Sequence, residues 1–263
     1  RKYFKATGDK FLNKQISEIG NKGLFTKEID DAQLNKKVDI AIHSLKDLPT
    51  ELPKGLRLAG VLKREDPNDA VFSLKEIKLN KSKKKLIVGT SSIRRKVQLQ
   101  KLNSRIQVKD IRGNLGTRIK KVGEGKYDCI ILATAGLKRL KIRNNFKKID
   151  VRNIIPSAGQ GVIAIVTCKN KIIEKLIKEL NHTRTFIESD CERLFLKSLD
   201  GSCKTPIGAI AKIVKKEKKD YLFFRYMASS LDGKRLVKGN TFFKLKSYKK
   251  MSLDLGKKIK KLI

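Results

Sequence analysis

Short apolar runs, rich in β-branched residues, recur through the first two thirds of the chain and alternate with amphipathic stretches. Such runs predict buried strands, and the stretches between them predict helices. A turn at Gly23 leads into one of these helices, which ends near Asn35. Strands that alternate with helices predict open α/β sheets. The predicted strands are residues 3–7, 38–42, 56–61, 86–88, 106–111, 127–132 and 162–166.

The last third of the chain has a different pattern. Predicted helices over residues 172–180 and 185–199 are followed by strands over residues 207–213, 220–227 and 235–244. An amphipathic helix begins near residue 248. Helices and strands grouped in this way predict a small α+β domain.

Two loops divide these patterns. The charge-rich segment 64–69 predicts a turn and marks a first domain boundary. The run at 162–166 follows a glycine-containing loop, and we expect it to return to the first sheet.

A compact polar set follows the strand predicted at 38–42. His43, Ser44, Lys46 and Asp47 come before Pro49, which ends the segment. Ligands bind at the carboxyl ends of strands in open α/β sheets. An adjacent Lys–Asp pair is more often a solvated surface pair. Its position at a strand end favours a chemical role.

The strand predicted at 86–88 ends in small hydroxyl residues, including Thr90 and Ser92. Such residues cap the free N–H groups at a helix start, and the same N–H groups favour an anion. Arg94 and Arg95 follow in the first turn, where a positive charge opposes the helix dipole. We therefore expect a negative group beside them.

Arginines also follow the next two predicted strands. Arg112 and Arg118 come after the strand at 106–111, and Arg139 comes after the strand at 127–132. Any one of them is more often an ordinary surface charge. In a parallel sheet, however, three successive strand ends share one edge. Because arginine binds carboxylate and phosphate in a bidentate way, this edge predicts a ligand with several acidic groups.

The charge balance is strongly basic, with 63 Lys+Arg against 26 Asp+Glu and a net charge of +37. This balance suggests an acidic partner. Much of the excess is lysine in runs at 81–85, 215–219 and 257–261, which are typical of solvated surfaces. The chain has no Trp, and few aromatic residues lie among these lysines, so a stacking platform for nucleic acid is poorly supported.

The chain has four cysteines, Cys129, Cys168, Cys191 and Cys203, without C-x-x-C spacing, and two histidines. Neither a metal site nor a disulfide scaffold is predicted, and a reducing compartment is expected. No apolar stretch has the length of a membrane helix. A buried structural thiol is the usual interpretation of a cysteine. Cys203 differs because it lies in a Gly-Ser-Cys-Lys-Thr-Pro loop.

Seven segments, in order, resemble the porphobilinogen deaminases, also called hydroxymethylbilane synthases. The segments are His43 to Pro49, Arg64 to Pro67, Gly89 to Arg95, Arg112 to Arg118, Ala135 to Arg139, Gly159 to Gly161 and Gly201 to Cys203. The resemblance implies an α/β fold with two doubly wound domains, similar to type II periplasmic binding proteins, plus a small α+β third domain. We expect domain 1 at residues 1–66 and 160–181, domain 2 at 67–159 and domain 3 at 182–263.

The resemblance also implies an activity in porphyrin and haem biosynthesis. Members condense four porphobilinogen molecules head to tail, release ammonia and produce hydroxymethylbilane. They do so on a dipyrromethane cofactor held by a thioether, which here falls on Cys203. Asp47 corresponds to the catalytic aspartate. The implied cofactor-binding residues are Cys203, Lys46, Thr90, Ser92, Arg94, Arg95 and Arg118, and the implied substrate-binding residues are Arg112, Arg118 and Arg139.

Two features depart from the family pattern. Glu18 stands where many members carry a lysine near the cleft. The opening strand and helix of the family, which carry an Arg and a Ser at the active site, have no match. We therefore expect an N-terminally truncated fragment that aggregates and is inactive alone. The compartment stays open between cytoplasm and plastid.

We expect a monomer that acts on a small molecule, without a metal, a nucleic-acid partner or a membrane partner. A periplasmic-type anion-binding protein is the first alternative, and it would need neither Cys203 nor Asp47. A nucleic-acid-binding protein is the second, and it rests on net charge alone. Intact mass separates the enzyme from the anion-binding protein, because only the enzyme carries a covalent dipyrrole.

Overall fold

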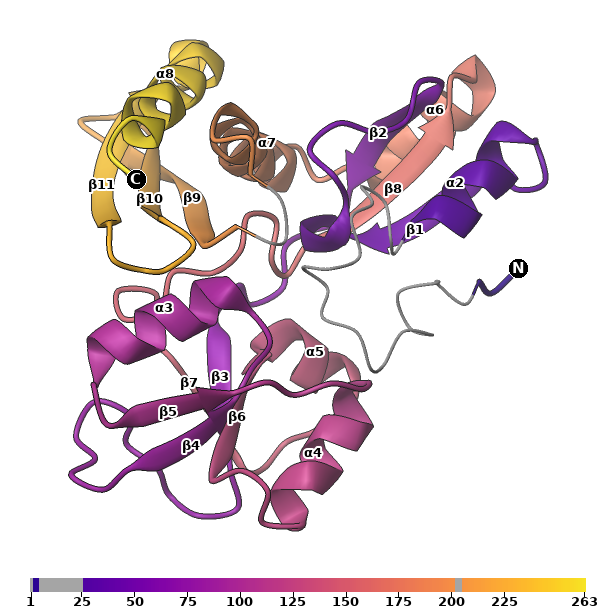
Figure 1. Ribbon diagram of the computed structural model, residues 1–263. Coiled ribbons are helices and arrows are strands. Elements are labelled where there is room, and N and C mark those ends of the chain that lie inside the picture. Colours follow the sequence, from indigo (N-terminus) through magenta and orange to yellow (C-terminus); the bar gives the residue numbers. More distant parts are fainter. Residues whose placement is uncertain (1, 5–25, 202–204) are drawn as a thin grey trace.

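The computed structural model describes residues 2–4, 26–201 and 205–263 (Figure 1). Their strands form three sheets, each in its own lobe, and the segments near residues 62–68 and 149–162 cross between the first two. The sheets confirm the predicted fold class of two α/β units and a small α+β unit. Within the described residues, no helix has the length and apolar character needed to cross a bilayer.

The first lobe contains a sheet with the strand order β1-β8-β2. These strands are Ile40–Ser44, Ile163–Cys168 and Leu56–Val61, and the accompanying helices are α2 (Lys27–Leu34) and α6 (Lys171–Leu180). β8 pairs antiparallel with both neighbours. The predicted return of the chain to the first sheet is therefore confirmed.

The strand predicted at 38–42 is displaced and less buried than expected. Val38 N–H donates to the Ala32 carbonyl, so this residue closes the turn after α2 instead of joining the sheet. Ala41 and His43 face the interior, whereas Ile42 is 59% exposed. The strand alternates with period two, as a one-sided strand does.

The second lobe is a five-stranded sheet with the order β5-β4-β6-β3-β7. β4 pairs in parallel with both β5 and β6, so the expected common edge of these three strand ends is confirmed. Helices α3, α4 and α5 follow these three strands. The bounds are β3 Asp69–Phe72, β4 Leu86–Gly89, α3 Ile93–Leu102, β5 Ile106–Lys109, α4 Leu115–Gly123, β6 Cys129–Ala133, α5 Thr134–Arg139 and β7 Phe146–Lys148.

Two strands of this sheet were not predicted. β3 begins at Asp69, which the sequence pattern assigns to a turn, and all four of its residues are buried. A charged residue can open a buried strand here because two arginines neutralise it. β7 has only three residues, which is too short for a periodic signal.

The third lobe is the antiparallel sheet β11-β10-β9, with helices α7 and α8 packed against it (Figure 1). Its core centres on Phe195 of α7 and Phe224 of β10, whose ring centroids lie 5.2 Å apart. Each element lies close to its predicted position. The bounds are α7 Thr183–Ser198, β9 Ile207–Lys216, β10 Lys219–Ser229, β11 Leu236–Lys244, 3₁₀ helix η2 Leu245–Ser247 and α8 Tyr248–Lys260.

Four expectations lie outside the described residues. They are most of the strand predicted at 3–7, the position of Glu18, the turn at Gly23 and the loop position of Cys203.

Candidate functional site

Lys46 and Asp47 lie on a short 3₁₀ turn, η1 (Leu45–Asp47), directly after β1. The first residue of the turn fixes its position: Leu45 is fully buried, and its N–H donates to the Val162 carbonyl at 2.9 Å. Gly159 lies against Leu45 with a φ of +72°, and a Cβ there would approach the Leu45 side chain to 2.9 Å. This packing holds Lys46 half-buried and leaves Asp47 exposed.

The electrostatics of Lys46 place it near the arginine-bearing edge of the second sheet. Burial lowers its pKa below the ordinary value, while the carboxylates of Asp47 and Asp69 favour the charged form. Arg94 and Arg95 act with burial and lower the pKa further. The fold therefore brings Lys46 of the first lobe into electrostatic range of Arg94, Arg95 and Asp69 of the second, which agrees with the set that the family resemblance implies for Lys46 and the two arginines.

The hydroxyl residues before α3 cap that helix, as the sequence predicted. Ser92 is the N-cap residue, and its Oγ accepts a hydrogen bond from the Arg95 N–H at 3.4 Å. Thr90 Oγ1 accepts from the Ser92 N–H at 3.2 Å. Each hydroxyl keeps its own O–H available to donate.

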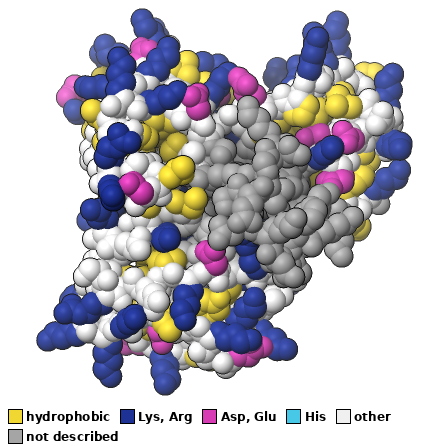
Figure 2. All heavy atoms as spheres, viewed as in Figure 1, with side chains coloured by type: hydrophobic (Ala, Val, Ile, Leu, Met, Phe, Trp, Pro, Cys, Tyr) yellow, Lys and Arg dark blue, Asp and Glu magenta, His cyan; other side chains and the backbone are white. Residues whose placement is uncertain are grey.

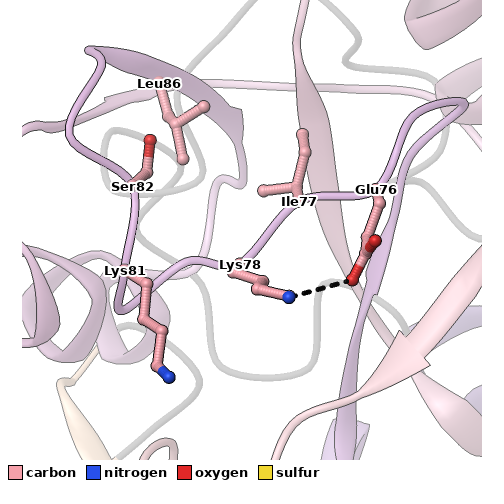
Figure 3. A pocket seen from close by; sticks show the side chains of 6 residues that line it. All are labelled: Glu76, Ile77, Lys78, Lys81, Ser82 and Leu86. Atoms are coloured by element: carbon pink, nitrogen blue, oxygen red, sulfur yellow. Dashed lines mark ion pairs between the residues drawn. The ribbon is translucent and has the colours of Figure 1, made fainter.

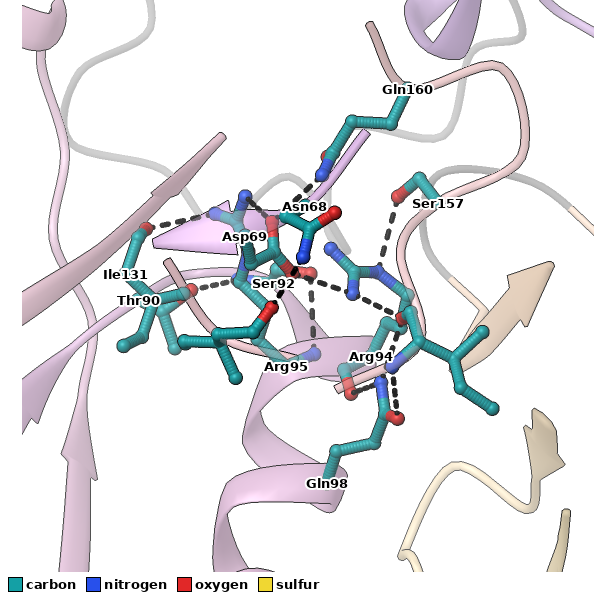
Figure 4. Close-up of polar contacts among 12 residues, drawn as sticks. Asn68, Asp69, Thr90, Ser92, Arg94, Arg95, Gln98, Ile131, Ser157 and Gln160 are labelled. Carbon is teal, nitrogen blue, oxygen red and sulfur yellow. Dashed lines mark hydrogen bonds and ion pairs between the residues drawn. The ribbon is translucent and has the colours of Figure 1, made fainter. Parts of the chain in front are cut away.

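The negative group expected beside Arg94 and Arg95 is a residue of the protein. Arg94 Nη1 donates to Asp69 Oδ2 at 2.9 Å, and Arg95 Nη2 donates to Asp69 Oδ1 at 2.7 Å (Figure 4). Burial by itself raises the pKa of Asp69, but the two guanidinium groups outweigh burial and hold the pKa well below its ordinary value. Sequence reasoning missed Asp69 because it assigned the residue to a charged turn.

Backbone carbonyls and one serine hydroxyl accept from further donors of these arginines. Arg94 also donates to the Ile155 carbonyl at 2.6 Å and to Ser157 Oγ at 3.1 Å. Arg95 also donates to the Ile131 carbonyl at 2.9 Å. Its Nε is buried and has no hydrogen-bond partner among the described residues. The two side chains are therefore fixed in orientation, with one buried donor left over.

The arginines that follow β5 lie at the same edge. Arg118 is half-buried, and its Nε donates to the Gly113 carbonyl at 2.7 Å. Burial is the largest cause that lowers the pKa of Arg118, and the positive charges of Arg95 and Arg112 lower it further. Three guanidinium groups therefore share one electrostatic environment.

Arg139 differs from the others. It is the last residue of α5, so the whole helix separates it from the end of β6, and its side chain is exposed. Within the part of the chain that the structure describes, no hydrogen bond or ion pair joins it to the other candidate residues.

The candidate site therefore has a strong excess of positive charge. Two carboxylates, Asp47 and Asp69, stand among five cations. We call these cations the cation cluster, and its members are Lys46, Arg94, Arg95, Arg112 and Arg118. A ligand with several carboxylates matches this set, and the exposed Asp47 could accept hydrogen bonds from it or stabilise a cation on it.

This cluster is distinct from the general basic surface. Figure 2 shows lysine and arginine side chains spread over every lobe of the visible face, with fewer acidic ones between them. A surface hollow of about 350 Å³ lies near Glu76, Ile77 and Lys78, on the loop between β3 and β4 (Figure 3). No predicted site residue lines that hollow, so it is not part of the candidate site. Because basic side chains are spread over every lobe, net charge alone does not mark the candidate site.

Comparison with known proteins gives two family matches. The model described as porphobilinogen deaminase, dipyromethane cofactor binding domain, matches residues 1–174. The model of the porphobilinogen deaminase C-terminal domain matches residues 186–263.

Curated relatives agree with these matches. Porphobilinogen deaminase of a Nitratiruptor species is 41% identical over 97% of this chain and 82% of the relative. That of Syntrophomonas wolfei is 41% identical over 91% of this chain and 78% of the relative. Among solved structures, the periplasmic aliphatic sulphonate binding protein of Escherichia coli is 12% identical, with a TM-score of 0.40, over 66% of this chain and 57% of that one.

Proposed function

The chain belongs to the porphobilinogen deaminase family, and we propose that Asp47 and the cation cluster carry out the family reaction in this protein. The enzyme is a hydroxymethylbilane synthase, a transferase of porphyrin biosynthesis. It condenses four porphobilinogen molecules head to tail, with release of ammonia, on a dipyrromethane cofactor. The observation that supports the residue assignment is that Lys46, next to Asp47, lies in electrostatic range of Arg94 and Arg95, and that Arg118 lies in range of Arg95.

The described residues fit a dipyrromethane group. Its acetate and propionate side chains are carboxylates. The five cations of the cation cluster outnumber the two protein carboxylates among them, Asp47 and Asp69. Arg95 Nε is a buried donor that has no acceptor among the described residues. Burying such a donor costs about 1–3 kcal/mol, so an acidic ligand in reach of it would be favoured.

We propose that Lys46, Arg94, Arg95 and Arg118 bind the cofactor carboxylates, and that the Thr90 and Ser92 hydroxyls donate to them. When bound, the cofactor supplies the pyrrole ring that is extended. Cys203, which lies outside the described residues, is the proposed thioether anchor.

Arg112 and Arg118 are proposed to bind the carboxylates of porphobilinogen. Arg139, exposed at the end of α5, is proposed as an outer contact for the incoming substrate. Bidentate binding of a carboxylate fixes its orientation as well as its position.

Asp47 is proposed as the catalytic residue. In each cycle, the bond between the aminomethyl carbon and the amino nitrogen of porphobilinogen breaks. The same methylene carbon forms a bond to a carbon of the terminal pyrrole ring of the growing chain, and that ring carbon then releases a proton. Positive charge develops on the pyrrole nitrogen as ammonia leaves. The Asp47 carboxylate stabilises that charge and accepts the proton. A placed charge of this kind supplies about 10²–10³ in rate.

We further propose the domain boundaries stated above, which agree with the separation into three sheets. We also propose that the protein acts as a monomer on a small molecule, without a nucleic-acid or membrane partner. The described cysteines are free thiols, which supports a reducing compartment such as the cytoplasm or a plastid.

The test is turnover of porphobilinogen by the full-length enzyme and by its Asp47→Asn variant. We expect the variant to lose about 10²–10³ in kcat, while its stability stays the same because Asp47 is exposed. Asp39→Asn, at an exposed aspartate before β1, is the matched control and should retain full turnover. An Asp47→Asn variant as fast as the control would reject the assigned role.

A further inference from the structure

Gln160 lies where the second crossover segment passes the arginine pair. Its side chain is 1% exposed. The amide Nε2 donates to Asp69 Oδ1 at 2.9 Å and to the Pro67 carbonyl at 2.7 Å (Figure 4). Asp69 is the same carboxylate that holds Arg94 and Arg95. Gln160 therefore contacts the arginine pair through one shared residue.

The backbone of Gln160 leads in the other direction, toward the third lobe. Its carbonyl accepts from Arg64 Nε at 3.0 Å. Arg64 is bidentate to Glu192 of α7, with Nη1–Oε1 and Nη2–Oε2 distances of 2.6 and 2.9 Å. Glu192 is fully buried and also accepts from the Ala211 N–H of β9 at 2.8 Å. A continuous polar chain thus joins the second lobe to the third.

Gln160 differs in kind from the other side chains in this polar chain. Asp69 with its arginines and Arg64 with Glu192 are two closed, buried groups of ion pairs. Removing one partner of such a pair leaves an uncompensated buried charge and costs about 3–5 kcal/mol. Gln160 is neutral and joins the two groups. It can therefore be changed without creating an unpaired charge.

We propose that Gln160 is a positioning residue for the arginine pair: it fixes Asp69, and through it Arg94 and Arg95, relative to the third lobe. This inference rests on the proposed function, in which the third lobe carries the cofactor cysteine and the arginines bind the cofactor carboxylates. A cofactor that is bound by the cysteine at one end and by the arginines at its carboxylates requires these two sites to keep a fixed relative position. A misplacement of about 1 Å at a reacting centre can cost about 10²-fold in rate.

Gln33 of α2 provides a matched control. It is 0% exposed, and its amide Nε2 donates to the Val166 carbonyl at 2.9 Å and to the Asp39 carbonyl at 3.3 Å. It lies in the first lobe and makes no hydrogen bond to Asp69 or to the arginine pair in the described structure. Replacing either glutamine with methionine removes buried amide hydrogen bonds and keeps the side-chain length. Both changes should therefore lower stability by similar amounts.

The experiment compares Gln160→Met and Gln33→Met in thermal unfolding, in cofactor loading measured by intact mass, and in turnover of porphobilinogen. Wild-type turnover first establishes the proposed function. We expect similar falls in Tm for the two variants. Only Gln160→Met should also lose cofactor loading and about 10- to 100-fold in kcat/KM, largely in kcat. Equal losses in both variants, or full loading and turnover in Gln160→Met, would overturn the proposal.

Gln160→Glu gives a second test, made well below the Tm of the variant at each pH. Its carboxyl would lie against Asp69, and two adjacent carboxylates share a proton, which raises one pKa. In the protonated form the new carboxyl can donate to Asp69, as the amide does. The ratio of variant to wild-type turnover should therefore rise several-fold as the pH falls from about 8 to about 6. A ratio that does not change with pH would count against the role of this hydrogen bond.

Discussion

Arg95 donates to Asp69 at 2.7 Å, and both side chains are buried. An arginine at the start of a helix opposes the helix dipole, and here the compensating charge comes from a strand 26 residues earlier in the chain. The protein thus orients this arginine before any ligand arrives. A preorganised donor loses less entropy when it binds a carboxylate, which suits a site that must hold a growing chain of acidic rings.

Asp69→Asn should destabilise the protein by about 3–5 kcal/mol, because it leaves two buried guanidinium groups with a neutral partner. Urea unfolding measures this change. The exposed pair of Asp150 and Arg152 supplies the control, and Asp150→Asn should change the unfolding free energy little. Similar losses in the two variants would show that Asp69 is not the buried centre described here.

Acid should reveal the same carboxylate. The pKa of Asp69 is lower in the folded state than its ordinary 3.8, so its contribution to stability is full above about pH 4 and is lost as the pH falls toward the folded pKa. Unfolding free energies measured between about pH 5 and 2 should therefore fall more steeply in wild type than in Asp69→Asn. Parallel curves would contradict the assignment.

His43 should give a separate pH dependence at higher pH. Burial lowers its pKa below 6.5, so the unfolded chain takes up the proton first and stability falls as the pH drops through about 6.5. The buried Asp30, whose pKa burial raises, acts in the opposite direction but is present in both proteins compared. His43→Gln should therefore lose less stability than wild type between about pH 7 and 5. An unchanged slope in urea unfolding would argue against a buried neutral imidazole.

The arginines of the cation cluster should act through specific carboxylate contacts. Arg118→Leu should reduce cofactor loading and raise the KM for porphobilinogen about 10-fold or more, since a charged hydrogen bond is worth about 1.5–3 kcal/mol. The surface changes Lys83→Leu and Lys84→Leu should leave both unchanged. If the lysine variants lose as much as Arg118→Leu, a diffuse positive field rather than a site attracts the substrate.

Local pattern predicted most of the fold because its strands and helices are periodic over their own length. The strand at Leu56–Val61 has its predicted bounds. The same reasoning brought Arg94, Arg112 and Arg118 to one edge, since parallel strands fix where their ends lie. Sequence reasoning therefore predicts the elements whose hydrophobic periodicity lies within their own residues.

The parts it missed depend on partners far away in the chain. The local sequence assigns Asp69 to a turn, because its neutralisation by Arg94 and Arg95 is visible only in the structure. The local sequence also assigns Gln160 to a loop, although its side chain donates a hydrogen bond to Asp69, 91 positions away. Gly161 was assigned only to a loop, yet a Cβ there would come within 2.4 Å of the Glu65 carbonyl. The close approach of the two crossover segments therefore requires glycine at this position.

The thiols of the described residues are poor candidates for covalent attachment. Burial raises the pKa of Cys129 to about 12, and Cys191 is also buried, with its pKa raised. The thiolate is the reactive form of cysteine, so these two side chains are inert. Cys168 is half-buried, and its thiol lies 3.3 Å from the Gln33 carbonyl. Cys203 is the proposed anchor because the family resemblance places the thioether in its Gly-Ser-Cys loop.

The intact mass of the purified enzyme tests the account most directly. We expect wild type and Cys168→Ala to exceed their sequence masses by one dipyrromethane, and Cys203→Ala to match its sequence mass. A dipyrromethane adduct on Cys203→Ala, or an active wild type without the adduct, would contradict the account.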